Sequence, residues 1–175
     1  MKSINNFLLE GQPGSGKTTL IQKMIQRLAH LKLSGFYTEE IRESGQRKGF
    51  RINTLDGKEG ILAHVDFKHG TRTGKYGVDV QAFEDLVIPC LKNAVAGSDL
   101  ILIDEIGKME LFSERFKGAV TACLESPVPV IASIMQKPHP FADRIRMRPD
   151  VKRIIVTREE QGFIIQELVE EIGLG

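Results

Sequence analysis

The sequence predicts an α/β fold in which a mostly parallel sheet is covered by helices on both faces. Three observations predict it. Strand-length apolar runs alternate along the chain with patterns of helical spacing. Several of these runs are apolar at successive positions, as in strands that are buried on both faces of a sheet. The length of 175 residues, with 41% hydrophobic and 27% charged residues, suits one globular unit. We therefore expect a single domain over residues 1–175.

The first predicted unit is a strand, a glycine turn and a helix. Residues Ile4–Glu10 are compatible with a strand and end at a glycine. From Lys17 onward the apolar residues recur at helical spacing, at Leu20, Ile21, Met24, Ile25 and Leu28. Residues Gly35–Arg42 then predict a second strand.

A hairpin is predicted to interrupt this alternation. The segments Lys48–Leu55 and Lys58–Val65 flank Asp56-Gly57, and an Asp-Gly pair supplies the positive φ that a tight turn needs. We expect this insertion, at about residues 44–66, to extend one edge of the sheet in antiparallel fashion. Residues Asp66–Val78 contain three glycines and no period, which predicts a loop.

The second half of the chain returns to alternating strands and helices. Asp79 is the expected N-cap of a helix that ends near Gly97, and Pro89 inside it predicts a kink. Thr157 and Glu160 fit a capping box that opens the last helix. The other expected elements are strands at Leu100–Asp104, Val128–Ile134 and Lys152–Val156, and helices from Ser113 to about Leu124 and over Phe141–Met147.

The glycine turn carries the strongest functional signal. The run Gly11-Gln12-Pro13-Gly14-Ser15-Gly16-Lys17-Thr18 matches the P-loop pattern GxxxxGK[ST] between a predicted strand and a predicted helix. Glycines let backbone N–H groups surround phosphate oxygens, and the helix N-terminus favours negative charge. We expect Lys17 to reach the β- and γ-phosphates and the Thr18 hydroxyl to ligate Mg²⁺. The predicted fold is therefore that of a P-loop nucleoside-triphosphatase.

A second functional signal lies at the end of a buried strand. The run Leu100-Ile101-Leu102-Ile103-Asp104-Glu105 looks like a Walker B segment, whose carboxyl end faces the ligand side of an open α/β sheet. Asp104 is expected to hold Mg²⁺, directly or through water. Because side chains alternate along a strand, Glu105 should point elsewhere, towards an attacking water. We assign Glu105 and Lys17 as catalytic residues.

Three weaker candidates each have a plainer alternative. Ser133 is either a γ-phosphate contact or a turn former. The stretch from Lys137 to Arg153 has a net charge of +4 and holds either an arginine-finger-like cation or a solvated basic face. Its six basic residues are Lys137, Arg144, Arg146, Arg148, Lys152 and Arg153. The loop with Arg72, Lys75 and Tyr76 either closes over a nucleotide or is an ordinary connection.

The composition of the chain argues against some classes of binding partner. The net charge of +1 gives no global attraction to nucleic acid or anionic lipid. No apolar run approaches the length of about 18 residues of a membrane span, and the start lacks the apolar segment of a secretory signal, so we expect a cytoplasmic protein. Cys90 and Cys123 are far apart in apolar stretches, which favours two buried thiols. The sequence does not define an oligomeric state.

Five segments resemble the successive blocks of a small P-loop nucleoside-triphosphatase family, that of cancer-related nucleoside-triphosphatase and its archaeal and bacterial relatives. They are GQPGSGKTTL (11–20), GFYTEEIRE (35–43), KGFRI (48–52), GKYGVDVQAFE (74–84) and DEIGKMELF (104–112). The similarity covers nearly the whole chain. It implies a RecA-like fold and Mg²⁺-dependent hydrolysis of ATP, GTP, CTP and UTP to diphosphate and phosphate. It also implies nucleotide contacts along the strand into Ile106 and Gly107.

The chain departs from this family at the start of its last helix. The family usually has an Asn-Arg-Asp type of segment where this chain reads Glu159-Glu160-Gln161-Gly162. A nucleotide role of that arginine would be absent here or pass to Arg158, and hydrolysis would then be slower than in relatives.

Two alternatives to hydrolysis stay open. The first is a nucleotide or small-metabolite kinase, against which the adjacent Glu105 argues, because a kinase gains nothing from a carboxylate that activates water. The second is a nucleotide-gated binding module whose hairpin docks a protein or RNA. No aromatic pair can be assigned as a base clamp, so we expect weak discrimination between bases.

Overall fold

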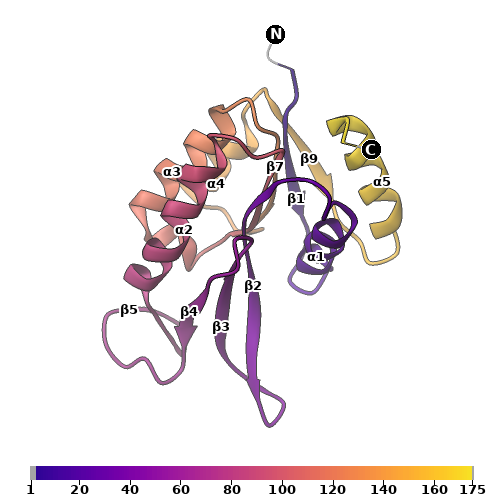
Figure 1. The fold of residues 1–175 in the computed structure, drawn as a ribbon. Helices are drawn as coiled ribbons and strands as arrows, with labels where there is room; N and C mark the ends of the chain where they lie inside the picture. Colours follow the sequence, from indigo (N-terminus) through magenta and orange to yellow (C-terminus); the bar gives the residue numbers. More distant parts are fainter. Residues whose placement is uncertain (1–2, 175) are drawn as a thin grey trace.

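A nine-stranded mixed sheet runs through residues 3–174, the part of the chain that the computed structural model describes (Figure 1). Its strand order is β5-β6-β4-β3-β2-β7-β8-β1-β9. The parallel strands are β2 (Leu33–Glu43), β7 (Leu100–Ile106), β8 (Val130–Ile134), β1 (Asn6–Glu10) and β9 (Val151–Ile155). They correspond to the five expected strands, so the predicted α/β class is confirmed.

Helices cover both faces of this sheet (Figure 1). On one face lie α2 (Val80–Ala94), α3 (Glu114–Glu125) and α4 (Pro140–Arg146), and on the other lie α1 (Lys17–Arg27) and α5 (Gln161–Ile172). Each layer encloses its own apolar cluster. In the larger cluster, Phe36, Phe83 and Phe116 pack edge to face with ring centroids 5.1 to 5.8 Å apart. None of the helices within residues 3–174 is long and apolar enough to cross a membrane.

The expected antiparallel extension is present at the edge of β2. The first part of β2 pairs in parallel with β7, and the rest pairs antiparallel with β3 (Gln46–Thr54), which is followed by β4 (Glu59–His64). The turn between β3 and β4 contains Gly57 at a φ of +89°. The long β2–β3 ribbon projects away from the helical layers (Figure 1).

The loop expected at 66–78 is a wrong prediction. Two short strands, β5 (Thr71–Thr73) and β6 (Tyr76–Val78), pair with each other there, and β6 also pairs with β4. Strands of three residues are too short to show a period in sequence, which explains the error.

The helix boundaries follow the predicted caps with one exception. Asp79 accepts a hydrogen bond from the Ala82 N–H, and Ser113 accepts one from the Phe116 N–H. The capping box at Thr157 is a wrong prediction, since α5 begins only at Gln161 without a side-chain cap. The Thr157 hydroxyl instead donates to the Glu160 carboxylate at 2.8 Å. Helix α2 is continuous through Pro89, and a short 3₁₀ helix, η1 (Glu110–Phe112), precedes α3.

Candidate active site

The P-loop joins the end of β1 to the first turn of α1. Gly16 is the N-cap of α1 and adopts a φ of +95°, a conformation that L side chains rarely adopt. A Cβ at this position would lie 2.1 Å from the side-chain nitrogen of Gln161. Lys17 Nζ donates to the Gly11 carbonyl oxygen at 2.6 Å and to that of Gln12 at 3.4 Å. The loop therefore holds its ammonium group against its own backbone.

A cavity of about 720 Å³ opens beside this loop. Both sequence signals meet there, because Lys17 and Thr18 line it from the P-loop while Asp104 and Glu105 line it from β7. Its remaining walls come from Pro13, Gly14, Gly16, Thr19, Gln22, Thr38, Glu39, Glu40, Phe50, Arg158 and Gln161. The other P-loop residues predicted as binding residues, Gly11, Gln12 and Ser15, line a separate cavity beside β9.

Asp104 is held in position by the neighbouring strand β8. It is 2% exposed, and the Ser133 hydroxyl donates to its Oδ1 at 2.6 Å. Burial raises the pKa of Asp104, while hydrogen bonds from Ser133 and Thr18 and the positive charge of Lys17 oppose the rise. Asp104 Oδ2 is buried without a hydrogen-bond partner among residues 3–174. A buried carboxylate oxygen near a threonine hydroxyl is a hard-oxygen donor set that fits Mg²⁺.

Glu105 shares the cavity with Asp104, although strand alternation predicts that it points elsewhere. The pairing of β7 with β8 shifts register between Ile103 and Ile106, so regular alternation does not apply at this point. Burial and the negative charge of Asp104 raise the pKa of Glu105, and Lys17 opposes the rise. A carboxylate with a raised pKa is a better proton acceptor than an exposed one.

A third carboxyl group, that of Glu110, lies beside Glu105. It was not predicted from the sequence. A Cβ on Gly107 would lie 2.6 Å from Glu105 Oε1 and 2.8 Å from Glu110 Oε2, so this position has no room for a side chain. Glu110 is 5% exposed, and its burial, aided by the charge of Glu105, raises its pKa well above the usual range. Its position in a 3₁₀ turn gives no periodic signal in the sequence.

The apolar part of the β7 segment supports the carboxylates from the core. The side chains of Leu100, Ile101, Leu102, Ile103 and Ile106 are completely buried in the two apolar clusters and do not line the cavity. Ser133 is likewise fully buried. Its hydroxyl is engaged with Asp104, so it orients that carboxylate rather than facing the cavity.

The segment before α5 packs against the P-loop. Arg158 Nε donates to the Gly14 carbonyl oxygen at 2.9 Å, and Gln161 Nε2 donates to that of Gly16 at 3.1 Å. Lys23 of α1 in turn donates to Gln161 Oε1 at 2.8 Å. Arg158, to which the arginine role would pass if it is not absent from this chain, thus reaches the cavity wall. Gln161, which belongs to the segment that departs from the family pattern, lines the wall beside it.

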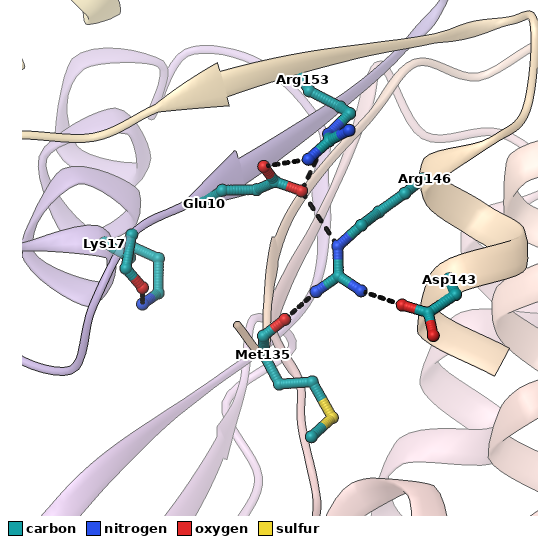
Figure 2. A network of polar contacts seen from close by, with 7 residues as sticks. Glu10, Lys17, Met135, Asp143, Arg146 and Arg153 are labelled. Atoms are coloured by element: carbon teal, nitrogen blue, oxygen red, sulfur yellow. Dashed lines mark hydrogen bonds and ion pairs between the residues drawn. The ribbon is translucent and has the colours of Figure 1, made fainter. Parts of the chain in front are cut away.

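The basic stretch is mostly engaged in structural ion pairs. Arg146 and Arg153 both donate to the Glu10 carboxylate, with distances of 2.9 to 3.0 Å, at the end of β1 (Figure 2). Arg148 pairs with Asp150, and Lys152 pairs with Glu167 and Glu171. Arg144 lies over the Phe141 ring. Lys137 is the member of the stretch that lines a cavity together with Glu105 and Glu110.

The loop that was expected either to close over a nucleotide or to be an ordinary connection packs on the hairpin instead. Arg72 donates to the carbonyl oxygens of Phe67 and Lys75. Tyr76 is buried, and its hydroxyl accepts a hydrogen bond from Arg47 at 2.9 Å. The hairpin contributes to the cavity through Phe50, a residue that the sequence did not mark.

Comparisons with known proteins agree with this geometry. A family model described as NTPase matches residues 6–169. Nucleoside-triphosphatase THEP1 of Thermotoga sp. (strain RQ2) is 43% identical over 163 residues, which cover 93% of this chain and 92% of the relative. Cancer-related nucleoside-triphosphatase of Homo sapiens is 41% identical over 179 residues, with 94% of each chain covered.

Two solved structures resemble the whole fold. The crystal structure of THEP1 from the hyperthermophile Aquifex aeolicus matches with a TM-score of 0.87 at 38% identity, covering 95% of this chain and 98% of that one. The solution structure of a human cancer-related nucleoside triphosphatase matches with a TM-score of 0.80 at 39% identity, covering 97% of both chains.

Proposed function

Because the chain belongs to the NTPase family and is a nucleoside-triphosphatase, we propose that it hydrolyses ATP, GTP, CTP and UTP to the diphosphate and orthophosphate with Mg²⁺ as cofactor. One observation carries the proposal. Lys17 and Thr18 of the P-loop line the same cavity as Asp104 and Glu105 of β7. This arrangement brings together a phosphate-binding cation, two oxygen ligands for a divalent cation and a carboxylate for proton transfer.

Each residue of the site has a distinct role in hydrolysis. Thr18 and Asp104 would hold Mg²⁺, which supplies positive charge to the phosphate oxygens when bound. Lys17 binds the β- and γ-phosphates, and the backbone N–H groups of the P-loop surround them. Glu105 orients the attacking water and accepts its proton. Ser133 keeps the Asp104 carboxylate in place through the hydrogen bond to Oδ1.

The cavity walls support broad base specificity. Phe50 is the one aromatic side chain among the described residues that line the nucleotide cavity, so a base would have one stacking partner and no clamp. Stacking on one ring does not distinguish purines from pyrimidines strongly. We therefore expect turnover of the four triphosphates to agree within about an order of magnitude, since the bases would differ by only a part of the about 1–3 kcal/mol that a single stack contributes.

Product analysis with each triphosphate tests the proposal. The protein is incubated with ATP, GTP, CTP or UTP in Mg²⁺, and the released orthophosphate and diphosphate are quantified without any acceptor. For each of the four substrates, diphosphate and orthophosphate should form in equal amounts, and EDTA should abolish the formation of both. Phosphate transfer that occurs only when a hydroxyl acceptor is supplied would instead identify a kinase. Nucleotide binding without turnover would identify a binding module.

A further inference from the structure

A second cavity, of about 520 Å³, adjoins the nucleotide cavity on the side of Glu105. The two cavities share Pro13, Lys17, Thr38, Phe50 and Glu105 in their walls, whereas Thr18 and Asp104 line only the first. The second cavity extends from these shared residues to Met109 and Met135. Glu105 therefore stands between the second cavity and the expected Mg²⁺ ligands Thr18 and Asp104.

Two lysines without a charged partner line this second cavity. Lys108 and Lys137 are exposed, and within residues 3–174 neither forms an ion pair or a side-chain hydrogen bond. The other two cations in its wall are already engaged. Arg47 binds Glu40 and the Tyr76 hydroxyl, and Lys17 donates to the Gly11 and Gln12 carbonyl oxygens and is the proposed ligand of the β- and γ-phosphates. The two ammonium groups are thus the cations of this cavity that are available to an anion.

The loop that carries Lys137 is anchored on both sides of its backbone. The Met135 N–H donates to the Ile106 carbonyl oxygen at 3.0 Å, and the Arg146 guanidinium donates to the Met135 carbonyl oxygen. Arg146 is itself fixed by Asp143 at 2.7 Å and by Glu10, the residue directly before the P-loop (Figure 2). Lys137 follows this anchored residue by two positions, so its backbone is placed by the same network that holds the end of β1.

The proposed hydrolysis gives this cavity a chemical role. Water attacks the γ-phosphorus in line with the leaving group, a new P–O bond forms, and the bond from the γ-phosphorus to the bridging oxygen breaks with its electron pair leaving on the diphosphate. Glu105 takes the proton of the water. The new orthophosphate is displaced towards the side of the attacking water, which is the side of Glu105.

We propose that the second cavity is the binding site for the orthophosphate product, with Lys108 and Lys137 supplying its positive charge. This inference rests on the proposed hydrolysis. Glu110 also lines the cavity, and burial raises its pKa well above the usual range, which favours the uncharged form of its carboxyl group. An oxyanion that leaves the γ-position thus meets two free ammonium groups before it reaches solvent.

Product inhibition tests this site with orthophosphate as the probe. The inhibition constants of orthophosphate and of ADP are measured for the wild type and for the double variant Lys108→Ala/Lys137→Ala. We expect the orthophosphate constant to rise about tenfold, the scale of one charge-assisted contact, and the ADP constant to stay unchanged. Added salt should shrink the difference, because the lysines are exposed. Arg144→Ala is the matched control, since Arg144 is exposed on the same stretch and lines neither cavity.

A direct binding measurement separates this inference from the proposed function. Equilibrium dialysis of labelled orthophosphate against the protein with Mg²⁺ and ADP needs no turnover. Binding in the wild type that is weakened in the double variant and kept in Arg144→Ala supports the site even if no hydrolysis is detected. Unchanged orthophosphate binding and inhibition in the double variant, or an equal loss in Arg144→Ala, would overturn it. A fall in kcat with unchanged orthophosphate inhibition would also overturn it, because the lysines would then act on the reaction and not on its product.

Discussion

Replacement of Glu105 by glutamine separates proton transfer from nucleotide binding. Glutamine has nearly the shape of glutamate and keeps a hydrogen-bonding oxygen, but it has lost the basicity. Glu105 lies in the cavity that contains Lys17 and Thr18, and the negative charge of Asp104 and burial raise its pKa. Asp104 cannot accept the proton in its place while it serves as a metal ligand.

The size of the effect follows from what the carboxylate supplies. A positioned general base contributes about 10² to 10⁴-fold to the rate, so Glu105→Gln should lower turnover by that factor. The affinity for nucleotide should stay near that of the wild type, because Lys17 and the P-loop backbone are unchanged. Asp104→Asn should differ by weakening Mg²⁺-dependent nucleotide binding itself.

Single-turnover hydrolysis of a γ-labelled triphosphate measures the chemical step directly. Nucleotide affinity is measured in parallel by fluorescence titration, and Glu114→Gln serves as the control because Glu114 is an exposed residue that pairs with Lys117 on α3. Full single-turnover hydrolysis by Glu105→Gln would refute the assignment of Glu105. Glu39 and Glu40, which line the same cavity, would then be the next carboxylates to replace.

Three further predictions concern stability, thiol reactivity and the P-loop contact. A Cβ on Gly35, at a φ of +122°, would lie 1.8 Å from the Leu102 carbonyl oxygen. Gly35→Ala should therefore lower the free energy of unfolding, measured in urea, by about 3 kcal/mol or more. Gly45→Ala, at an open turn, should lower it by only about 1 kcal/mol. Burial raises the pKa of Cys123 to about 12, so its thiol stays protonated at pH 8. The thiol should therefore react with a thiol reagent only after the protein unfolds, and rapid labelling of the native protein would disprove this. Arg158→Ala should raise the KM for ATP about fivefold through loss of a charged hydrogen bond to the P-loop, and an unchanged KM would show that this contact plays no part in nucleotide binding.

The sequence predicted those parts of the site that depend on local patterns. The glycines before Lys17 and the aliphatic run before Asp104 each form a motif within a few residues, and a parallel sheet brings the carboxyl ends of their strands to one edge. The five parallel strands were also predicted from local patterns, because strand-length segments alternate along the chain with segments of helical spacing.

Contacts between distant segments were outside the reach of such patterns. The contact of Gln161 with Gly16 spans 145 residues, and no local feature marks Gln161 as a partner of the P-loop. Glu110 approaches Glu105 only because the chain turns through Gly107, where a side chain would collide with both carboxylates. Ser133 carries a polar group within a buried strand, and only the pairing of β7 with β8 shows that it serves Asp104.

The rate of γ-phosphate release by Lys17→Ala is the most direct test of the P-loop as the site of hydrolysis. The assay compares the variant with the wild type and with Lys92→Ala, an exposed lysine on α2, using ATP and GTP in Mg²⁺. Loss of a charge-assisted contact of about 1.5–3 kcal/mol should lower kcat/KM by about 10- to 150-fold for both nucleotides. Lys92→Ala should hydrolyse both at the wild-type rate. Wild-type hydrolysis by Lys17→Ala would contradict the account and would place the reaction outside the P-loop cavity.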